Sequence, residues 1–470
     1  MGAEKQKDIS GSSAEAAQAM GQTAKQNKIT EGVIWKQLLL FFFPILFGTF
    51  FQQLYNAADA MIVGRFVGKE ALSAVGGGTG TVIQVLVGFF VGLSSGATVV
   101  ISQYYGAKRP EMVSYAVHTA MAFSIAAGVV MMIGGIAAAP AVLQAMDTPA
   151  DVLEPSILYI RIYFLGIIGN LIYNMGSGIL RAVGDSRRPL YFLMASCLTN
   201  IVLDILFVIG LKMGVAGAAL ATILSQALSA VLVIAVLMRT EDMHRLELKK
   251  LRFDGRMFGR IIRIGLPAGL QSIMYSSSNV IIQASVNSLG TDTVAAWTAY
   301  SKIDSVFWMI INAFGISVTT FVGQNYGAGK EQRVRKGVRV CMGMSAVTTV
   351  LISLILYYFG IYVYHLFTTD AAVVEIGIQM MRFLVPTYFT YIVIEIFSGA
   401  LRGVGDCWIP MLISCLGICV IRVLWILFAV PLRRDIYTIM FSYPLTWTVT
   451  SILFLVYFHK FSRLGGKRRK

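Results

Sequence analysis

Five polar side chains stand in segments that are otherwise apolar, and their chemical types suit the binding of a cation. They are two carboxylates, two amides and one hydroxyl: Asp59, Asp204, Asn200, Asn174 and Thr222. Asn200 and Asp204 are four residues apart, so a helix places both on one face. Carboxylate, amide and hydroxyl oxygens suit a hard cation, and a carboxylate removed from water also holds a proton readily. We therefore predict a coupling site for H⁺ or Na⁺ and no other metal.

An isolated amide or hydroxyl in such a segment has a simpler interpretation. Buried Asn and Thr side chains often form hydrogen bonds between helices, and for Thr222 taken alone this interpretation is preferred. Two carboxylates with several polar neighbours favour the functional interpretation, because ionisable residues inside a membrane usually face a cavity or a partner. Asp204 lies 15 residues after Pro189, which is roughly 22 Å along a helix. Asp59 lies late in the first apolar segment, so we expect the two carboxylates at comparable depth.

The elements that must hold these side chains are membrane-spanning helices. The chain has 470 residues, of which 56% are hydrophobic and 13% are charged, whereas about 25% of residues are charged in a soluble domain. Twelve apolar stretches between residues 34 and 460 are long enough to span a bilayer, which takes about 20 residues. We therefore predict an all-α polytopic membrane protein with twelve transmembrane helices.

The net charge of +15 predicts an orientation in the membrane rather than nucleic-acid binding. Lys and Arg concentrate in the loops at 107–111, 184–189, 239–256 and 327–337, whereas the loops at 139–153 and 366–373 have none. Basic loops stay on the cytoplasmic side. We expect a multi-pass protein of the plasma (inner) membrane with both termini in the cytoplasm, including a disordered tail at 1–33 and a basic tail at 461–470.

The chain contains an internal duplication. SGILRAVGDSRRP (177–189) returns as SGALRGVGDCWIP (398–410) with eight of thirteen positions identical, and QYYGA (103–107) returns as QNYGA (324–328). Both pairs are offset by 221 residues (398 − 177 and 324 − 103). We predict an N-lobe at 34–238 (helices 1–6), a cytoplasmic linker at 239–257 and a C-lobe at 258–460 (helices 7–12). Six spans in each half make the repeats parallel, with the substrate path between the lobes.

The repeated turns also carry a repeated Arg and Asp. These pairs are Arg181 with Asp185 and Arg402 with Asp406. We interpret each pair as a salt bridge that locks a helix–turn–helix, in preference to a role in contacting substrate.

The second half does not repeat the polar set of the first. Trp425 stands at the register of Asp204, Ile421 at that of Asn200, and Asn279 at that of Asp59. The charges of this half are Lys302, Asp304, Glu395 and Arg422, which either neutralise each other as structural pairs or line the transport path. The residues of a C-lobe cavity would be Tyr275, Asn279, Tyr391, Glu395, Asp304 and Arg422. This asymmetry predicts that ion coupling belongs to the N-lobe.

Several motifs together resemble those of the multidrug and toxin extrusion (MATE) family. They are the first span from Pro44 to Asp59 followed by VGKEALSAVG (67–76), the paired LRxVGD turns, and FVGQNYGA (321–328). The resemblance runs from about residue 34 to 460. It implies a V-shaped fold of two six-helix lobes and an alternating-access antiporter that exports organic cations or other xenobiotics in exchange for Na⁺ or H⁺.

The resemblance also implies roles for individual residues. Asp59 matches the family's coupling carboxylate in the first helix, and Asn200 and Asp204 match the polar pair of the fifth. Thr222 and Asn174 fall at a threonine of the sixth helix and an asparagine of the fourth. Some branches carry a glutamate and an aspartate in the C-lobe where Tyr275 and Tyr391 stand here, so the pattern is similar to the branch related to the DNA-damage-inducible bacterial transporters.

Other functions fit the sequence less well. A flippase for lipid-linked precursors is the alternative, and it would be expected to have a more basic central cavity. An enzyme is not expected, since the four His are scattered and no nucleophile or phosphate-loop motif appears. We expect no cofactor beyond the coupling ion, small organic cationic or amphipathic molecules and the lipid bilayer as partners, and a monomer.

Overall fold

The computed structural model describes residues 28–462, 464 and 465, and these residues form helices joined by short loops. The helices of the first half are α2 (Lys28–Glu31), α3 (Ile34–Phe66), α4 (Lys69–Gly76), α5 (Gly78–Gly106), α6 (Pro110–Ala145), α7 (Ala150–Leu165), α8 (Ile167–Ala182), α9 (Arg187–Asp204), the π-helix η1 (Ile205–Gly210) and α10 (Gly214–Arg239).

The helices of the second half follow a short linker that contains the 3₁₀ turn η2 (Leu248–Lys250). They are α11 (Gly255–Asn287), α12 (Thr291–Gly327), α13 (Glu331–His365), α14 (Ala371–Leu384), the 3₁₀ turn η3 (Val385–Thr387), α15 (Tyr388–Gly403), α16 (Trp408–Ser414), the π-helix η4 (Cys415–Val420), α17 (Ile421–Ala429), α18 (Ile436–Val456) and the π-helix η5 (Tyr457–Phe461). All twelve predicted spans therefore fall on helices.

Eleven of these twelve spans also have the apolar composition of a membrane helix. Ten helices in the described part of the chain are long and apolar enough, and α7 with α8 forms an eleventh span that is bent by 49°. The remaining segment, α11, has 33 residues, about 50 Å at 1.5 Å per residue. It reaches across a bilayer by length, but its Ser, Gln, Asn and Arg residues lower its hydropathy.

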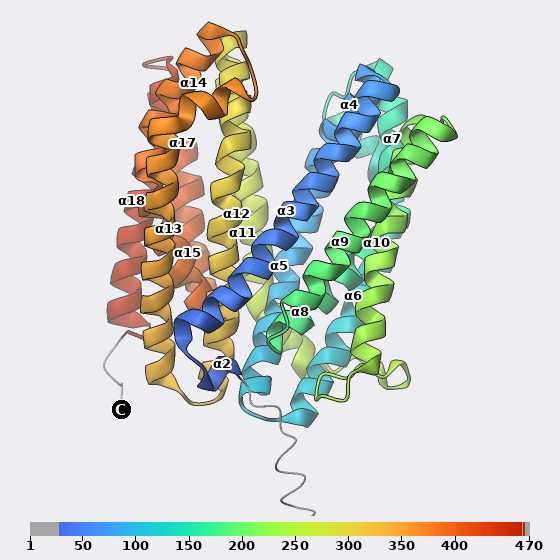
Figure 1. Cartoon of the computed structure of the whole chain (residues 1–470), viewed down its shortest axis with the longest axis vertical. Helices are drawn as coiled ribbons and strands as arrows, with labels where there is room; N and C mark the ends of the chain where they lie inside the picture. Colours follow the sequence, from blue (N-terminus) through green and yellow to red (C-terminus); the bar gives the residue numbers. More distant parts are fainter. Residues whose placement is uncertain (1–27, 463, 466–470) are drawn as a thin grey trace, which may run out of the picture.

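The two halves form two bundles that meet at one end of the molecule and diverge toward the other (Figure 1). Helix α2 lies at the end where the bundles meet (Figure 1). We call this end the closed end. The predicted V-shaped architecture of two six-helix lobes is confirmed.

The lobes exchange the beginnings of their first helices at the closed end. Leu38, Phe41 and Phe42 of α3 are buried in the hydrophobic core of the C-lobe, and Phe42 stacks on Phe314 of α12 with ring centroids 4.2 Å apart. In return, Ile261 of α11 is buried in a core formed by α5, α6 and α8 of the N-lobe. The predicted lobe boundaries at 34 and 258 divide the sequence into two repeats. In space, however, the start of α3 packs in the C-lobe and the start of α11 packs in the N-lobe.

Part of the segment 1–33, which the sequence predicts to be a disordered tail, is helical. Residues 28–31 form α2, and Ile29 is buried in the C-lobe core. The Lys330 ammonium donates to the Thr30 carbonyl at 3.0 Å, and the Arg333 guanidinium donates to the Ile29 carbonyl at 3.1 Å. These bonds hold a segment whose polar composition alone predicts disorder. Residues 1–27, 463 and 466–470 of the predicted tails lie outside the described residues.

Candidate ion-coupling site

The two predicted carboxylates come together between α3 and α9. Asp59 lies on α3, and Asp204 is the last residue of α9 before the chain enters the π-helix η1. Helices α3 and α9 pack against each other, and the two carboxyl groups are close enough to interact electrostatically. A local π-helix often accompanies a functional site. The sequence prediction that two residues 145 positions apart form one pair (204 − 59) is consistent with this geometry.

The oxygens of this pair are buried and lack donors. Asp59 is 6% exposed and Asp204 is fully buried. One carboxylate oxygen of Asp59 and both of Asp204 have no hydrogen-bond partner among the described residues, and neither amide atom of Asn200 has one. An unpartnered buried polar atom is costly, and a bound ion or proton is one way to satisfy it. The arrangement therefore suits a small cation or proton held between two carboxylates and one amide.

A second group of polar residues surrounds the carboxylate pair, and the sequence analysis did not predict most of it. Tyr159 of α7 interacts with both Asp59 and Thr222, while the Thr222 hydroxyl donates to the Ala218 carbonyl of its own helix at 3.0 Å. The membership of Thr222 in the ion site therefore stays a prediction. Gln226, one turn beyond Thr222, interacts with the hydroxyls of Tyr55 and Tyr163. The sequence did carry a signal, because Tyr159 and Tyr163, like Thr222 and Gln226, are four residues apart and share a helix face.

Asn174 of α8 is engaged elsewhere. Its amide donates at 2.9 Å both to the backbone carbonyl and to the side-chain oxygen of Asn170, one turn earlier on the same helix. The side chain is half-buried. Asn174 therefore forms a local pair with Asn170, and its predicted membership in the ion site rests on sequence alone.

The C-lobe carries a different kind of carboxylate. Asp304 of α12 accepts hydrogen bonds from the Tyr388 hydroxyl at 2.5 Å and from the Trp308 indole at 2.6 Å. The Tyr300 hydroxyl lies 3.5 Å from the same carboxylate and 2.9 Å from the Tyr388 hydroxyl. Two short hydrogen bonds, one to each carboxylate oxygen, leave Asp304 well satisfied, and the Tyr300 hydroxyl can donate to the Tyr388 oxygen. The sequence predicted Asp304 as a cavity residue but did not find these donors, of which Tyr388 lies 84 positions away.

The aromatic rings around Asp304 link most of the predicted C-lobe cavity. Trp308 packs edge-on against Tyr391 at 4.6 Å, and the Tyr391 hydroxyl lies 3.5 Å from the Glu395 carboxylate. Tyr275 of α11 interacts with Tyr391 in turn. The Asn279 side chain, by contrast, is exposed on α11. Arg422 joins the same rings through Tyr443 and Trp447. Five of the six predicted residues therefore belong to one aromatic cluster.

The charges of the C-lobe do not form the structural pairs that one interpretation of the sequence offered. Arg422 lies over the Tyr443 ring at 4.2 Å and donates to the Thr446 hydroxyl at 3.3 Å. Lys302 is exposed on α12. No salt bridge joins Lys302, Asp304, Glu395 or Arg422 to any other residue in the part of the chain that the structure describes. Hydrogen bonds and ring contacts hold Asp304, Glu395 and Arg422 instead.

The interpretation of the LRxVGD turns as Arg–Asp salt bridges is wrong. Asp185 accepts from the backbone N–H groups of Arg187 and Arg188 at 3.1 Å and pairs with the Arg188 guanidinium at 3.2 Å. Asp406 instead accepts from the Tyr457 hydroxyl at 2.5 Å. A carboxylate at the beginning of a helix is stabilised by the free backbone N–H groups there. Asp185, two residues before α9, therefore binds the first N–H groups of that helix rather than Arg181.

The repeated glutamines join the two lobes at the closed end. The Gln103 amide of α5 donates to the Gly403 carbonyl at 2.9 Å, and the Gln324 amide of α12 donates to the Ala182 carbonyl at 2.7 Å. Both bonds are buried, and each joins the QxYGA motif of one repeat to the LRxVGD motif of the other. The two donors and the two acceptors are each related by the 221-residue offset (324 − 103 and 403 − 182). We call this crossed pair of bonds the glutamine latch.

Glycine makes the close approach at the latch possible. A Cβ at Gly106 would overlap the Gln324 carbonyl, and a Cβ at Gly327 would overlap the Gln103 carbonyl. The glycines of the QxYGA motifs therefore let α5 and α12 meet backbone to backbone. The sequence analysis used these motifs as evidence of duplication and did not predict that they contact each other.

These features define the class of the protein. The molecule consists of two helical lobes that interlock at one end and diverge at the other, and each lobe contains buried polar groups. This is the architecture of a polytopic membrane transporter.

Comparisons with known proteins place the chain within that class. A sequence model of the MatE family matches residues 44–206 and 267–427, one segment in each lobe. The chain is 27% identical over 435 residues to the probable multidrug resistance protein YoeA of Bacillus subtilis, covering 90% of this chain and 93% of that relative. It is 26% identical over 395 residues to the probable multidrug resistance protein NorM of Thermotoga maritima, covering 82% and 83%. The chain belongs to the MATE family.

Solved structures agree with this fold. A MOP superfamily transporter from Pyrococcus furiosus superposes with a TM-score of 0.85 at 23% identity, covering 93% of this chain and 97% of that one. A structure described as the outward-facing conformation of a multidrug resistance MATE family transporter gives the same TM-score, identity and coverage. The family and fold are thus those of a multi-pass membrane transporter. The assignment of the chain to the branch of DNA-damage-inducible transporters remains a prediction.

Proposed function

We propose that this protein is a secondary active antiporter that exports organic cationic or amphipathic molecules in exchange for entering H⁺ or Na⁺. The observation that carries the proposal is the buried Asp59–Asp204 pair. Three of its four carboxylate oxygens, and both amide atoms of the neighbouring Asn200, have no hydrogen-bond partner among the described residues. Binding of a proton or a Na⁺ ion there offsets the cost of burying two like charges. The names of the MATE relatives, which describe multidrug resistance proteins, support a drug as the exported substrate.

The geometry suggests how ion and substrate exchange. With the termini in the cytoplasm, as the basic loops predict, the closed end faces the cytoplasm and the diverging lobes face outward (Figure 1). An ion arriving from outside then has to enter the N-lobe to reach Asp59 and Asp204, which are buried between α3 and α9. Its binding would change the local charge, and release of the ion requires the opposite end to open. The coupling ion is the only small group that this proposal requires, and the chain acts as a monomer in the plasma (inner) membrane.

The alternative flippase function has less support. A lipid-linked phosphate needs free cations in the central path, and Arg422 is already engaged by Tyr443 and Thr446. Lys302 would be the other candidate. A flipping assay on undecaprenyl-linked substrates would detect this activity directly.

The test is efflux from proteoliposomes. A Na⁺ gradient and a pH gradient are imposed in separate experiments. We expect the purified protein to transport ethidium, a lipophilic cationic dye, in at least one of them, and the gradient that drives transport identifies the coupling ion. Efflux that neither gradient drives would refute the antiport proposal. Liposomes without protein are the control for passive dye leakage.

A further inference from the structure

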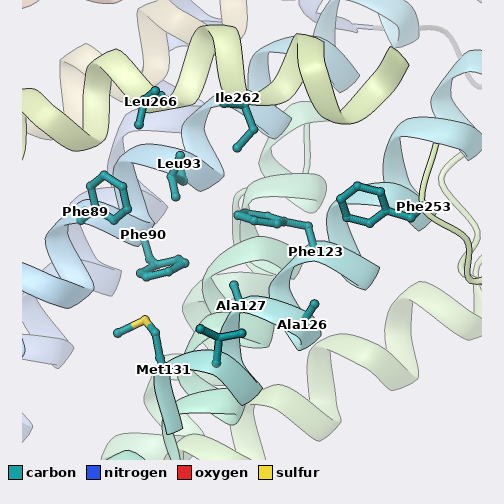
Figure 2. A pocket seen from close by; sticks show the side chains of 11 residues that line it. Phe89, Phe90, Leu93, Phe123, Ala126, Ala127, Met131, Phe253, Ile262 and Leu266 are labelled. Carbon is teal, nitrogen blue, oxygen red and sulfur yellow. The ribbon is translucent and has the colours of Figure 1, made fainter. Parts of the chain in front are cut away.

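An open apolar pocket lies where α11 packs against α5 and α6 of the N-lobe. Its volume is about 460 Å³, within the range of small-molecule pockets. Its lining residues come from α5, α6, the linker and α11: Phe89, Phe90, Leu93, Phe123, Ala126, Ala127, Val130, Met131, Phe253, Ile262 and Leu266. Figure 2 shows these side chains around a common space, with the small Ala126 and Ala127 forming one wall. No polar or charged side chain lines it.

The mouth of the pocket adjoins a basic stretch. Phe253 lies on the linker at the rim and is 53% exposed, and Lys249, Lys250, Arg252 and Arg256 surround it in the sequence. Lys250 pairs with Glu247 at 2.9 Å, and the Arg252 guanidinium lies 4.0 Å over the Tyr115 ring of α6. Lys249 and Arg256 are exposed and form no salt bridge with any described residue. Asp254 is occupied as the cap of α11, accepting from the Met257 N–H at 2.9 Å.

We propose that this pocket binds one acyl chain of an anionic phospholipid whose phosphate contacts Lys249 and Arg256. The apolar lining suits a hydrocarbon chain, and a basic cluster directly before a membrane span attracts anionic headgroups. An organic cation is disfavoured here, because the lining offers no carboxylate and the nearby unpaired charges have the same sign as the cation. The proposal does not depend on the antiport function.

The location of the pocket gives the lipid a role in conformation. Its walls come from α5 and α6 of the N-lobe and from α11 of the C-lobe (Figure 2). A movement that separates α11 from α5 and α6 changes the distance between these walls. A bound acyl chain therefore favours the conformation in which the pocket exists.

Lipid retention measured by native mass spectrometry tests this proposal. The probes are phosphatidylglycerol and phosphatidylcholine with identical acyl chains, titrated into the purified full chain. We expect one phosphatidylglycerol to be retained in preference to phosphatidylcholine. Replacing both free cations (Lys249→Gln with Arg256→Gln) should weaken phosphatidylglycerol binding roughly 30-fold, since each basic group near an anionic headgroup contributes separately. The matched control is Lys336→Gln with Arg339→Gln, two exposed cations of α13, which should change nothing.

Two further variants test the pocket itself. Ala127→Trp fills it, and Phe253→Asp places a negative charge at its exposed rim without disturbing a buried side chain. We expect both to lose the retained lipid, whereas Val347→Trp on α13, a position that is 61% exposed, should keep it. Equal binding of both lipids by the unmodified protein, or unchanged binding by the two pocket variants, would overturn the proposal. So would loss of ethidium efflux in Ala127→Trp with phosphatidylglycerol binding intact, because the pocket would then be a substrate passage.

Discussion

The two lobes bury their carboxylates in opposite ways. In the N-lobe, Asp59 and Asp204 face each other with oxygens that lack donors. In the C-lobe, Asp304 accepts from Tyr388 and Trp308. At the register of Asp204 the C-lobe has Trp425, whose indole donates to the Thr438 carbonyl of α18 at 2.8 Å.

This difference separates a carboxylate that needs an ion from one that holds a helix bundle together. A buried carboxylate that already has a donor on each oxygen gains little from binding a cation, whereas two carboxylates without such donors repel each other until one is neutralised. The two repeats thus share the arrangement of spans and turns but differ in the polar side chains buried inside each lobe. Each of the following experiments changes one side of this contrast.

Replacing Asp59 should have the largest effect on transport. We expect Asp59→Asn to reduce ion-driven ethidium efflux to the level of liposomes without protein, because an amide of the same shape can neither carry a proton nor supply a negative charge to Na⁺. Asp204→Asn should have the same effect. The measurement is gradient-driven efflux, with size-exclusion chromatography to confirm folding. Full efflux by either variant would remove the carboxylate pair from the coupling mechanism.

Replacing Asp304 should affect stability instead of coupling. Asp304→Asn removes the charge that strengthens the bonds from Tyr388 and Trp308, and we expect a loss of about 2 kcal/mol in the free energy of unfolding. Chemical denaturation in detergent measures this loss, and efflux should keep the same ion dependence. If Asp304→Asn were as stable as the unmodified protein but uncoupled, ion coupling would involve both lobes.

The glutamine latch tests whether the two halves contribute equally. Gln103→Ala and Gln324→Ala each remove one buried hydrogen bond, so each should shift the equilibrium toward opening of the closed end by about fivefold. Spin labels at two exposed positions, Arg109 directly before α6 and Glu331 at the start of α13, report the separation of the lobes. Gln283→Ala is the control, since that amide bonds within its own helix. If only one of the two latch variants shifted the equilibrium, the two hydrogen bonds would contribute unequally to the stability of the closed end.

Replacing Asn174 should have the smallest effect. Because its amide is bound to Asn170, we expect Asn174→Ala to leave the half-saturating ion concentration within about twofold, the range of substitutions away from a site. Asn200→Ala serves as the comparison and should raise that concentration more. A larger effect of Asn174→Ala than of Asn200→Ala would return Asn174 to the site and exclude Asn200.

The candidate site could be predicted in part because its strongest signals are local. Asp59 and Asp204 stand out against apolar neighbours in any reading of the chain, and the four-residue spacing of Asn200 and Asp204 fixes their common face. Tyr159 and Gln226 were missed because tyrosine and glutamine are ordinary residues in such helices. Their importance comes from what they contact, and those contacts are made by helices far away in the sequence.

The sequence alone determined the number of spans, the duplication and the asymmetry between the lobes, since each of these depends on composition or register along one segment. Only the tertiary structure decided the partners of the polar groups. It paired Asp185 with backbone N–H groups instead of Arg181, gave Asp304 its tyrosine and tryptophan donors, and joined Gln103 to Gly403 across the lobes. The physical reason is that a buried polar atom bonds whichever group the packing brings within about 3 Å. Helix packing brings together residues that the chain keeps hundreds of positions apart.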